Sequence, residues 1–272
     1  MKARKFLICA LAAGTAGAWS IGRAGLPPVP DPLSEAQTET AAPAPAHYGR
    51  VPRHFIRNDG QIAPEVLYYM KGSRGTVYLT AEEIVFDFVS GQPATPDRDL
   101  PPGEDPRPEK KPDPVSRLVF RLRFLGAVSK PAVEGEEELP GKINYFIGPR
   151  ENWRTGIPTY EKVVYRGLYP GIDLSIGFRD DNLAYRLTAA PGSDPGVIAL
   201  GYSGVEGLEI DSAGGLIVLT KFGGFRTPAP KAYQEVDGRP AEREAYFILH
   251  DETTAGLELP GHDPAHYLVI EF

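Results

Sequence analysis

Residues 165–178 read YRGLYPGIDLSIGF, a turn followed by a strand, and they set the architecture that the rest of the chain extends. Pro170 and Gly171 predict the turn, because proline presets φ near about −65° and glycine tolerates positive φ. From Ile172 to Phe178, apolar side chains stand at every second position. This period of two predicts a half-buried strand with one apolar face. Tyr165 and Tyr169 flank the turn, and we expect them to anchor it to a core.

The whole composition points to the same class. The 272 residues include 30 glycines and 28 prolines, which punctuate short apolar runs, and no long segment has a helical period. We therefore predict an all-β fold: a large antiparallel β-sandwich, or two fused β-sandwich halves, with short turns and few or no helices. The predicted domain spans residues 51–272, with possible halves at 51–150 and 151–272.

The first 50 residues are predicted to lie outside this domain. A basic start and a short apolar run, ended by Ala16-Gly17-Ala18, predict a signal peptide over 1–18, with a later cleavage site near Ala24 as the alternative. Residues 19–50 are rich in proline and alanine and predict a flexible linker. Cleavage after Ala18 removes three basic side chains and Cys9, so the net charge moves from −7 to −10 and no disulfide can form.

Two polar segments interrupt the strand pattern. Residues 91–114 hold eight prolines and ten charged side chains, and they predict a disordered insertion between two strands. After it, residues 116–125 alternate again, with Arg117, Arg121 and Arg123 on one face. We expect these arginines to form a solvated face bridged to acidic neighbours, with an anion or polysaccharide site as the alternative. Residues 134–138 carry four glutamates and are interpreted as a solvated acidic loop.

Several short motifs, in order along the chain, together resemble a known family. They comprise Phe55, Asn58, Gly60 and Gln61; Gly141–Gly148; Trp153-Arg154-Thr155; Pro158-Thr159-Tyr160; Tyr169–Leu174; Ala190–Pro195; Pro230–Gln234; and Leu268–Ile270.

The chain is similar to the uncharacterised domain found at the N-terminus of secreted bacterial proteins with seven-bladed β-propeller repeats. The resemblance covers most of residues 51–272 and implies an exported β-rich module, with no active site to carry over. In the family the last strand usually runs into an Asp-Pro and then into the repeats. Here Glu271-Phe272 ends the sequence, so we expect the domain to stand alone.

Candidate functional residues come from the aromatic and acidic side chains around the central turn. Trp153, Tyr160, Tyr165 and Tyr169 could form an aromatic platform for a sugar, or they could pack in the core. Asp173 is a candidate ligand-binding or acidic catalytic residue, although we expect it to hydrogen-bond the turn backbone. The sequence contains no recognisable catalytic motif, and we predict no catalytic residue, metal ligand or cofactor.

The sequence therefore predicts an exported, non-catalytic β-rich module of the periplasm or extracellular space, for binding or assembly. Its expected partner is an envelope protein or a polysaccharide. The acidic balance argues against nucleic acid, and the mature chain has no predicted membrane span. The alternatives are a carbohydrate-active hydrolase that uses surface carboxylates and a structural spacer. Two carboxyl groups at a suitable separation in a cleft would favour the hydrolase.

Overall fold

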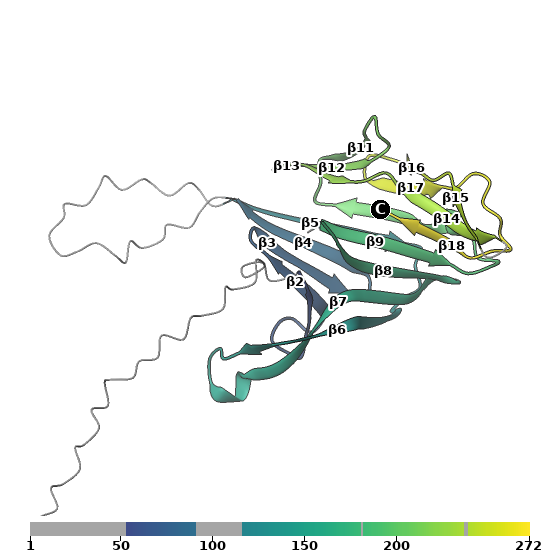
Figure 1. The fold of residues 1–272 in the computed structure, drawn as a ribbon. Helices are drawn as coiled ribbons and strands as arrows, with labels where there is room; N and C mark the ends of the chain where they lie inside the picture. The colour runs from purple at the N-terminus through teal and green to yellow at the C-terminus, as the bar shows by residue number, and fades with distance from the viewer. Residues whose placement is uncertain (1–52, 91–115, 181, 237–238) are drawn as a thin grey trace, which may run out of the picture. The chain divides into compact units, whose positions relative to one another are not determined.

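Strands dominate the computed structural model, which describes residues 53–90, 116–180, 182–236 and 239–272 (Figure 1). The predicted signal peptide and linker lie outside these ranges, as does the predicted insertion at 91–114. Within the described residues, eighteen β-strands are joined by turns and by two short 3₁₀ segments, η1 (Arg150–Asn152) and η2 (Pro195–Val197). None of these segments is a helix long and apolar enough to cross a membrane. The all-β prediction is confirmed.

The first nine strands are β1 (Phe55–Arg57), β2 (Val66–Gly72), β3 (Gly75–Thr80), β4 (Glu83–Ser90), β5 (Ser116–Leu125), β6 (Ala132–Tyr145), β7 (Arg154–Tyr169), β8 (Ile172–Arg179) and β9 (Asn182–Ala189). The second nine are β10 (Ala199–Ser203), β11 (Gly207–Ile210), β12 (Leu216–Thr220), β13 (Gly223–Thr227), β14 (Lys231–Val236), β15 (Arg239–Arg243), β16 (Tyr246–Leu249), β17 (Thr254–Glu258) and β18 (Leu268–Glu271).

Fifteen of these strands form one antiparallel sheet. Its order is β15-β14-β18-β9-β8-β7-β1-β2-β3-β4-β5-β10-β17-β16, and β6 pairs with β7 beside this path. The strands β1–β5, from 51–150, form one continuous block between two blocks of strands from 151–272, since β1 pairs with β7 and β5 pairs with β10. The remaining strands form a small sheet, β11-β12-β13, which lies beside β16 (Figure 1).

The central hairpin is β7–β8, and it has the turn and the alternation that the sequence predicts. Tyr165 pairs with Leu174 and Tyr169 pairs with Ile172 across the hairpin. From Ile172 to Gly177 on β8, the apolar side chains are buried and the residues between them are half-buried. Gly171 has φ of 72°, and a Cβ atom on it would lie 2.9 Å from the Cβ of Ser193. The turn therefore requires glycine both for its backbone conformation and for space.

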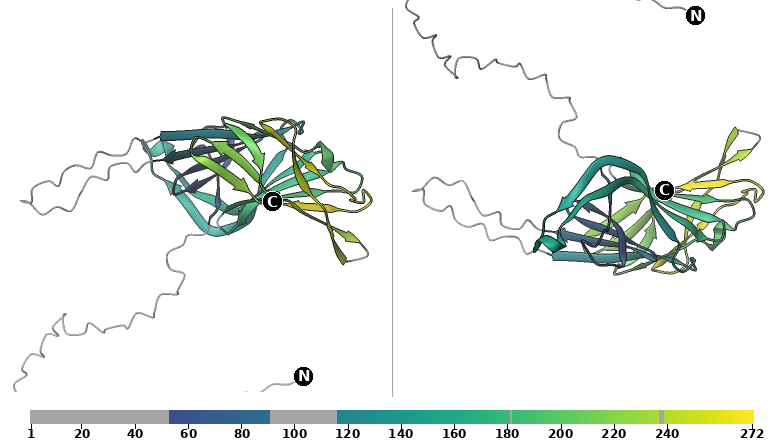
Figure 2. Two further views of the ribbon diagram at one scale, coloured as in Figure 1. Left: turned by 90° about the horizontal axis from the view of Figure 1, so that it is seen from above. Right: turned by 90° about the horizontal axis from the view of Figure 1, so that it is seen from below.

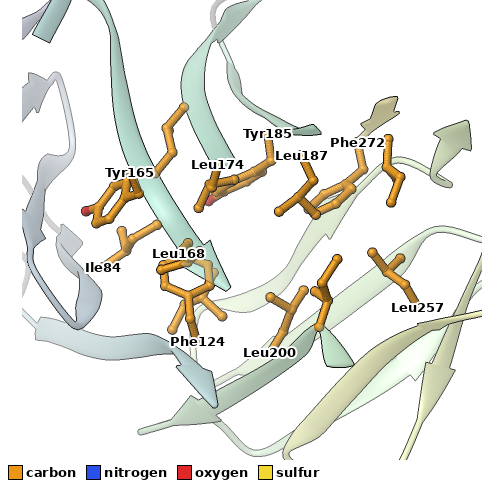
Figure 3. Close-up of a cluster of buried hydrophobic side chains, with 14 of the residues drawn as sticks. Ile84, Phe124, Tyr165, Leu168, Leu174, Tyr185, Leu187, Leu200, Leu257 and Phe272 are labelled. Atoms are coloured by element: carbon orange, nitrogen blue, oxygen red, sulfur yellow. The ribbon is translucent and has the colours of Figure 1, made fainter. Parts of the chain in front are cut away.

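The large sheet folds over its own apolar face and encloses the core (Figure 2). In Figure 3, Tyr165, Leu174, Tyr185, Leu187 and Phe272 project from β7, β8, β9 and the chain end toward Phe124, Leu200 and Leu257 on β5, β10 and β17. These side chains are at most 8% exposed. Because the two layers face each other as in a sandwich, apolar burial between them provides the main stabilisation.

The strand β5 confirms the prediction of a solvated arginine face. Leu118, Phe120, Leu122 and Phe124 are buried, whereas Arg117, Arg121 and Arg123 are exposed. Arg117 donates two hydrogen bonds to Asp87, both of 2.7 Å, and the other two arginines donate to Glu83. The arginines are therefore paired across β4–β5, and the Asp87 carboxyl has a lowered pKa because of the hydrogen bonds from Arg117.

The predicted acidic loop at 134–138 is wrong, because these residues belong to strand β6. Glu136 and Glu137 form ion pairs with Lys162 on β7, and Glu136 also pairs with Arg166. Gly135 lies against the Tyr160 ring, where a Cβ atom would come within 2.6 Å of the ring carbons. The glutamates are thus cross-strand partners of basic residues. The sequence of one strand does not show which residues lie opposite it.

Candidate functional site

The predicted residues of the central hairpin lie in two different environments. Tyr165 and Tyr169 are buried, and their hydroxyls are used within the protein: Tyr165 donates to the carbonyl of Thr80 (2.9 Å), and Tyr169 donates to the carbonyl of Ala199 (3.2 Å). Asp173 is more exposed. Its carboxylate accepts hydrogen bonds from the backbone N–H of Gly167 (2.7 Å) and from Arg166 (3.0 Å).

These bonds of Asp173 hold a bulge in β7. The pairing of β7 with β8 shifts register between Tyr165 and Tyr169, and Gly167, at φ of 57°, lies in that interval. Asp173 therefore satisfies the backbone where the ladder is interrupted, at the β7 bulge and not at the Pro170-Gly171 turn for which the bond was predicted.

The two remaining predicted residues are Tyr160, on β7, and Trp153, which directly follows η1 and precedes β7. Tyr160 is 8% exposed and packs edge-on against Tyr68, with ring centroids 5.8 Å apart. Trp153 is 40% exposed and packs edge-on against Phe146, at 5.0 Å. The five candidates thus do not share one surface. Binding of a polysaccharide or an envelope protein at Trp153 stays a prediction.

A different site lies between the layers, and we call it the interlayer pocket. It has a volume of about 340 Å³. Its lining comes from β2–β5, from the start of β9, from β10 and from the small sheet, and comprises Arg53, Met70, Gly72, Ser73, Arg74, Gly75, Val77, Phe86, Phe88, Phe120, Leu122, Asn182, Leu183, Tyr185, Tyr202, Val218, Phe225, Arg226 and Thr227. The volume falls within the range of small-molecule sites, about 300–1,000 Å³.

Four phenylalanines form an aromatic wall of the interlayer pocket. Phe86 stacks on Phe120 at 4.5 Å, and Phe88 stacks on Phe225 at 5.1 Å. Phe225 also lies 5.3 Å from Phe120, so the strand β13 of the small sheet is joined to the large sheet through this cluster. The aromatic wall is therefore preformed by packing between two separate sheets.

Two tyrosine hydroxyls of the pocket lack partners in the described part of the chain. Tyr185 is 8% exposed, Tyr202 is half-buried, and neither hydroxyl makes a hydrogen bond to another described residue. Yet every fully buried polar side-chain atom in the described ranges has a partner. The Tyr185 hydroxyl must therefore keep some contact with the open space of the pocket. Burial raises the pKa of both tyrosines, so both hydroxyls keep their protons at neutral pH.

Charged side chains at the interlayer pocket are all basic. Arg53, Arg74 and Arg226 are exposed members of its lining, which contains no Asp, Glu or His. Arg226 donates to Asp211, whereas the Arg74 guanidinium has no hydrogen bond or ion pair to any described residue. Elsewhere, His262 contacts the carbonyl of Leu259, and the described residues contain no cluster of three or more His, Cys, Asp or Glu side chains suited to a metal ion.

Sequence reasoning missed this pocket. Its aromatic residues appear in the sequence as ordinary alternating positions of β4, β5 and β13, which predict burial and not a cavity. The usable signal is that Tyr185 and Tyr202 stand on strand faces that are otherwise apolar. A buried tyrosine hydroxyl requires a hydrogen-bond partner.

An antiparallel sheet folded over a shared core, with an aromatic pocket between its layers, defines this protein as an all-β module. The chain belongs to the family described as domain of unknown function DUF7948, whose model matches residues 55–271. No curated protein and no solved structure matches the chain significantly.

Proposed function

We propose that the chain is an exported, non-catalytic binding module that holds a small ligand with an apolar body in the interlayer pocket. The observation that carries this proposal is a preformed aromatic wall in a pocket also lined by Tyr185 and Tyr202, whose hydroxyls have no hydrogen-bond partner among the described residues. Such a site combines a large apolar contact area with a few polar groups that fix orientation, the usual composition of a small-molecule site.

The chemistry of the lining supports binding without turnover. Hydrolysis requires a group that gives or takes a proton near neutral pH, and that role usually falls to His, Asp or Glu. The titratable side chains of the pocket are instead arginines, which stay charged, and tyrosines, which stay protonated. These groups bind and orient a ligand but supply no general base.

Export is supported by the chain's own start and by its family resemblance. Residues 1–18 have the basic, apolar and small-residue order of a signal peptide. The similarity to N-terminal domains of secreted propeller-repeat proteins supports the same location, the periplasm or the extracellular space. N-terminal sequencing of the protein recovered outside the cytoplasm is expected to begin at Trp19. Recovery of an intact Met1 would contradict the proposal.

Pocket occupancy is testable with an uncharged fluorescent dye such as N-phenyl-1-naphthylamine. The purified protein is expected to bind one dye molecule saturably, with increased fluorescence. Leu183→Trp places a larger side chain in the pocket and should abolish binding. Leu67→Trp, at a half-buried leucine of β2 that does not line the pocket, is the matched control and should bind normally. Absence of saturable binding by the unmodified protein would overturn the proposed function.

A further inference from the structure

The apolar and the charged lining residues of the interlayer pocket differ in their exposure. Its aromatic wall and aliphatic neighbours are apolar, whereas its exposed charged members are Arg53, Arg74 and Arg226. A ligand bound there meets three positive side chains and, among the lining residues, no carboxylate. Electrostatic complementarity therefore favours a ligand with a negative group at the exposed side.

Arg74 is the arginine best placed to serve such a ligand. It lies in the turn between β2 and β3, and the structure gives its guanidinium no acidic partner within the described ranges. Its neighbours differ: Arg226 is held by Asp211, and Nη1 of Arg53 lies 3.8 Å from the sulfur of Met70. The other basic pairs on this sheet show that acids usually accompany its arginines, as Asp87 and Glu83 do on β4. The absence of one at Arg74 leaves its planar donor fork available to a carboxylate or a phosphate.

Tyr185 on β9 and Tyr202 on β10 line the same pocket. Neither hydroxyl has a partner among the described residues, and Tyr185 is more than nine-tenths buried. A purely apolar ligand would leave both donors unsatisfied, at a cost in binding free energy. A ligand with an oxyanion head or an adjacent polar group would accept hydrogen bonds from them.

We infer, building on the proposed function, that the ligand is a small amphipathic anion: an alkyl or aryl body against the aromatic wall, with a carboxylate or phosphate head toward Arg74 and the tyrosine hydroxyls. The volume of about 340 Å³ lies near the lower end of the range for ligand sites. This size favours a single short chain or ring system and not a lipid with two long chains.

The test compares head groups on one body by isothermal titration calorimetry. Decanoate and decyl phosphate are expected to bind at least about tenfold more tightly than decanol and decyltrimethylammonium, because a charge-assisted hydrogen bond is worth about a factor of ten or more. The relative affinities of decanoate and decyl phosphate identify which head group the site prefers.

Variants at Arg74 assign the effect to the site. Arg74→Gln should weaken decanoate binding about tenfold and leave binding of the uncharged dye within about twofold. Arg239→Gln, at an exposed arginine of the edge strand β15, is the matched control and should change neither affinity. Thermal melts of both variants verify that they are folded.

The outcomes separate the two proposals. Saturable dye binding with equal affinity for decanoate and decyltrimethylammonium would overturn the anionic ligand and leave the proposed function standing. An Arg74→Gln variant that binds decanoate as tightly as the unmodified protein would also overturn it. If neither dye nor decanoate binds, both proposals fail.

Discussion

Two regions between the layers differ in how their tyrosine hydroxyls are used, and we call them the closed region and the open region. In the closed region, next to the β7–β8 turn, the hydroxyls of Tyr165 and Tyr169 bond to backbone carbonyls. In the open region, at the interlayer pocket, the hydroxyls of Tyr185 and Tyr202 have no partner in the described chain. The same residue type thus fixes the fold in one region and faces a cavity in the other. In this protein, the presence of a hydrogen-bond partner for the hydroxyl, more than the burial of the side chain, distinguishes the structural tyrosines from those at the pocket.

The largest expected effect on stability comes from truncating one leucine in each region. Leu174→Ala, at a 1% exposed position of the closed region, should lower the free energy of unfolding by about 2–5 kcal/mol, because a cavity forms in close packing. Leu183→Ala, half-buried at the pocket, should cost about 1 kcal/mol or less. Urea denaturation measures both. Equal losses would show that the pocket is packed as tightly as the core.

The turn that closes the hairpin provides the next test. Gly171→Val should destabilise the domain by about 1–3 kcal/mol, since valine resists the positive φ and its Cβ would crowd Ser193. Gly192→Val is the control for crowding, because Gly192 also has positive φ but no atom within 4 Å of a Cβ. Thermal melts should rank Gly171→Val as the more damaging. The reverse order would contradict the crowding argument.

Removal of one hydroxyl from each region gives a smaller effect and a sharper contrast. Tyr165→Phe leaves the carbonyl of Thr80 without its donor and should cost about 1–2 kcal/mol. Tyr185→Phe removes a hydroxyl that has no partner among the described residues, so stability should stay within about 0.5 kcal/mol of the unmodified protein. Chemical denaturation checks both values. A comparable loss in Tyr185→Phe would mean that its hydroxyl stabilises the fold.

The smallest expected effect is the pH dependence of stability that Glu271 contributes. Burial opposes ionisation of Glu271, but hydrogen bonds from Arg186 and Arg179 outweigh it and hold the pKa of the carboxyl below its ordinary value of 4.5. Stability from this group is therefore complete above pH 4.5 and is lost as pH falls through the lower folded pKa.

Melting temperatures of the unmodified protein and of Glu271→Gln, measured from pH 7 downward, check this effect. The variant should be less stable at pH 7 and should lose less of its remaining stability on acidification. The difference is small because partly solvated ion pairs contribute about 1 kcal/mol at most. Parallel curves would show that Glu271 does not contribute to acid sensitivity.

The sequence by itself determined the class of fold and the positions of several strands along the chain. Period-two alternation in 172–178 and 116–125 correctly identified β8 and β5, and Pro170-Gly171 correctly placed the turn between β7 and β8. Such signals are local, because the pleat puts successive side chains on opposite faces. Export and the signal peptide stay predictions, since those residues lie outside the described ranges.

Only the tertiary structure decided which strands are neighbours and where space is left between them. Residues 134–138 have the local composition of an acidic loop, but their pairing with basic residues of β7 makes them part of a strand. The interlayer pocket draws on residues from Arg53 to Thr227, brought together by a sheet that folds over itself and by a second small sheet. A cavity is what packing fails to fill, and it depends on long-range pairing that no single segment of sequence encodes.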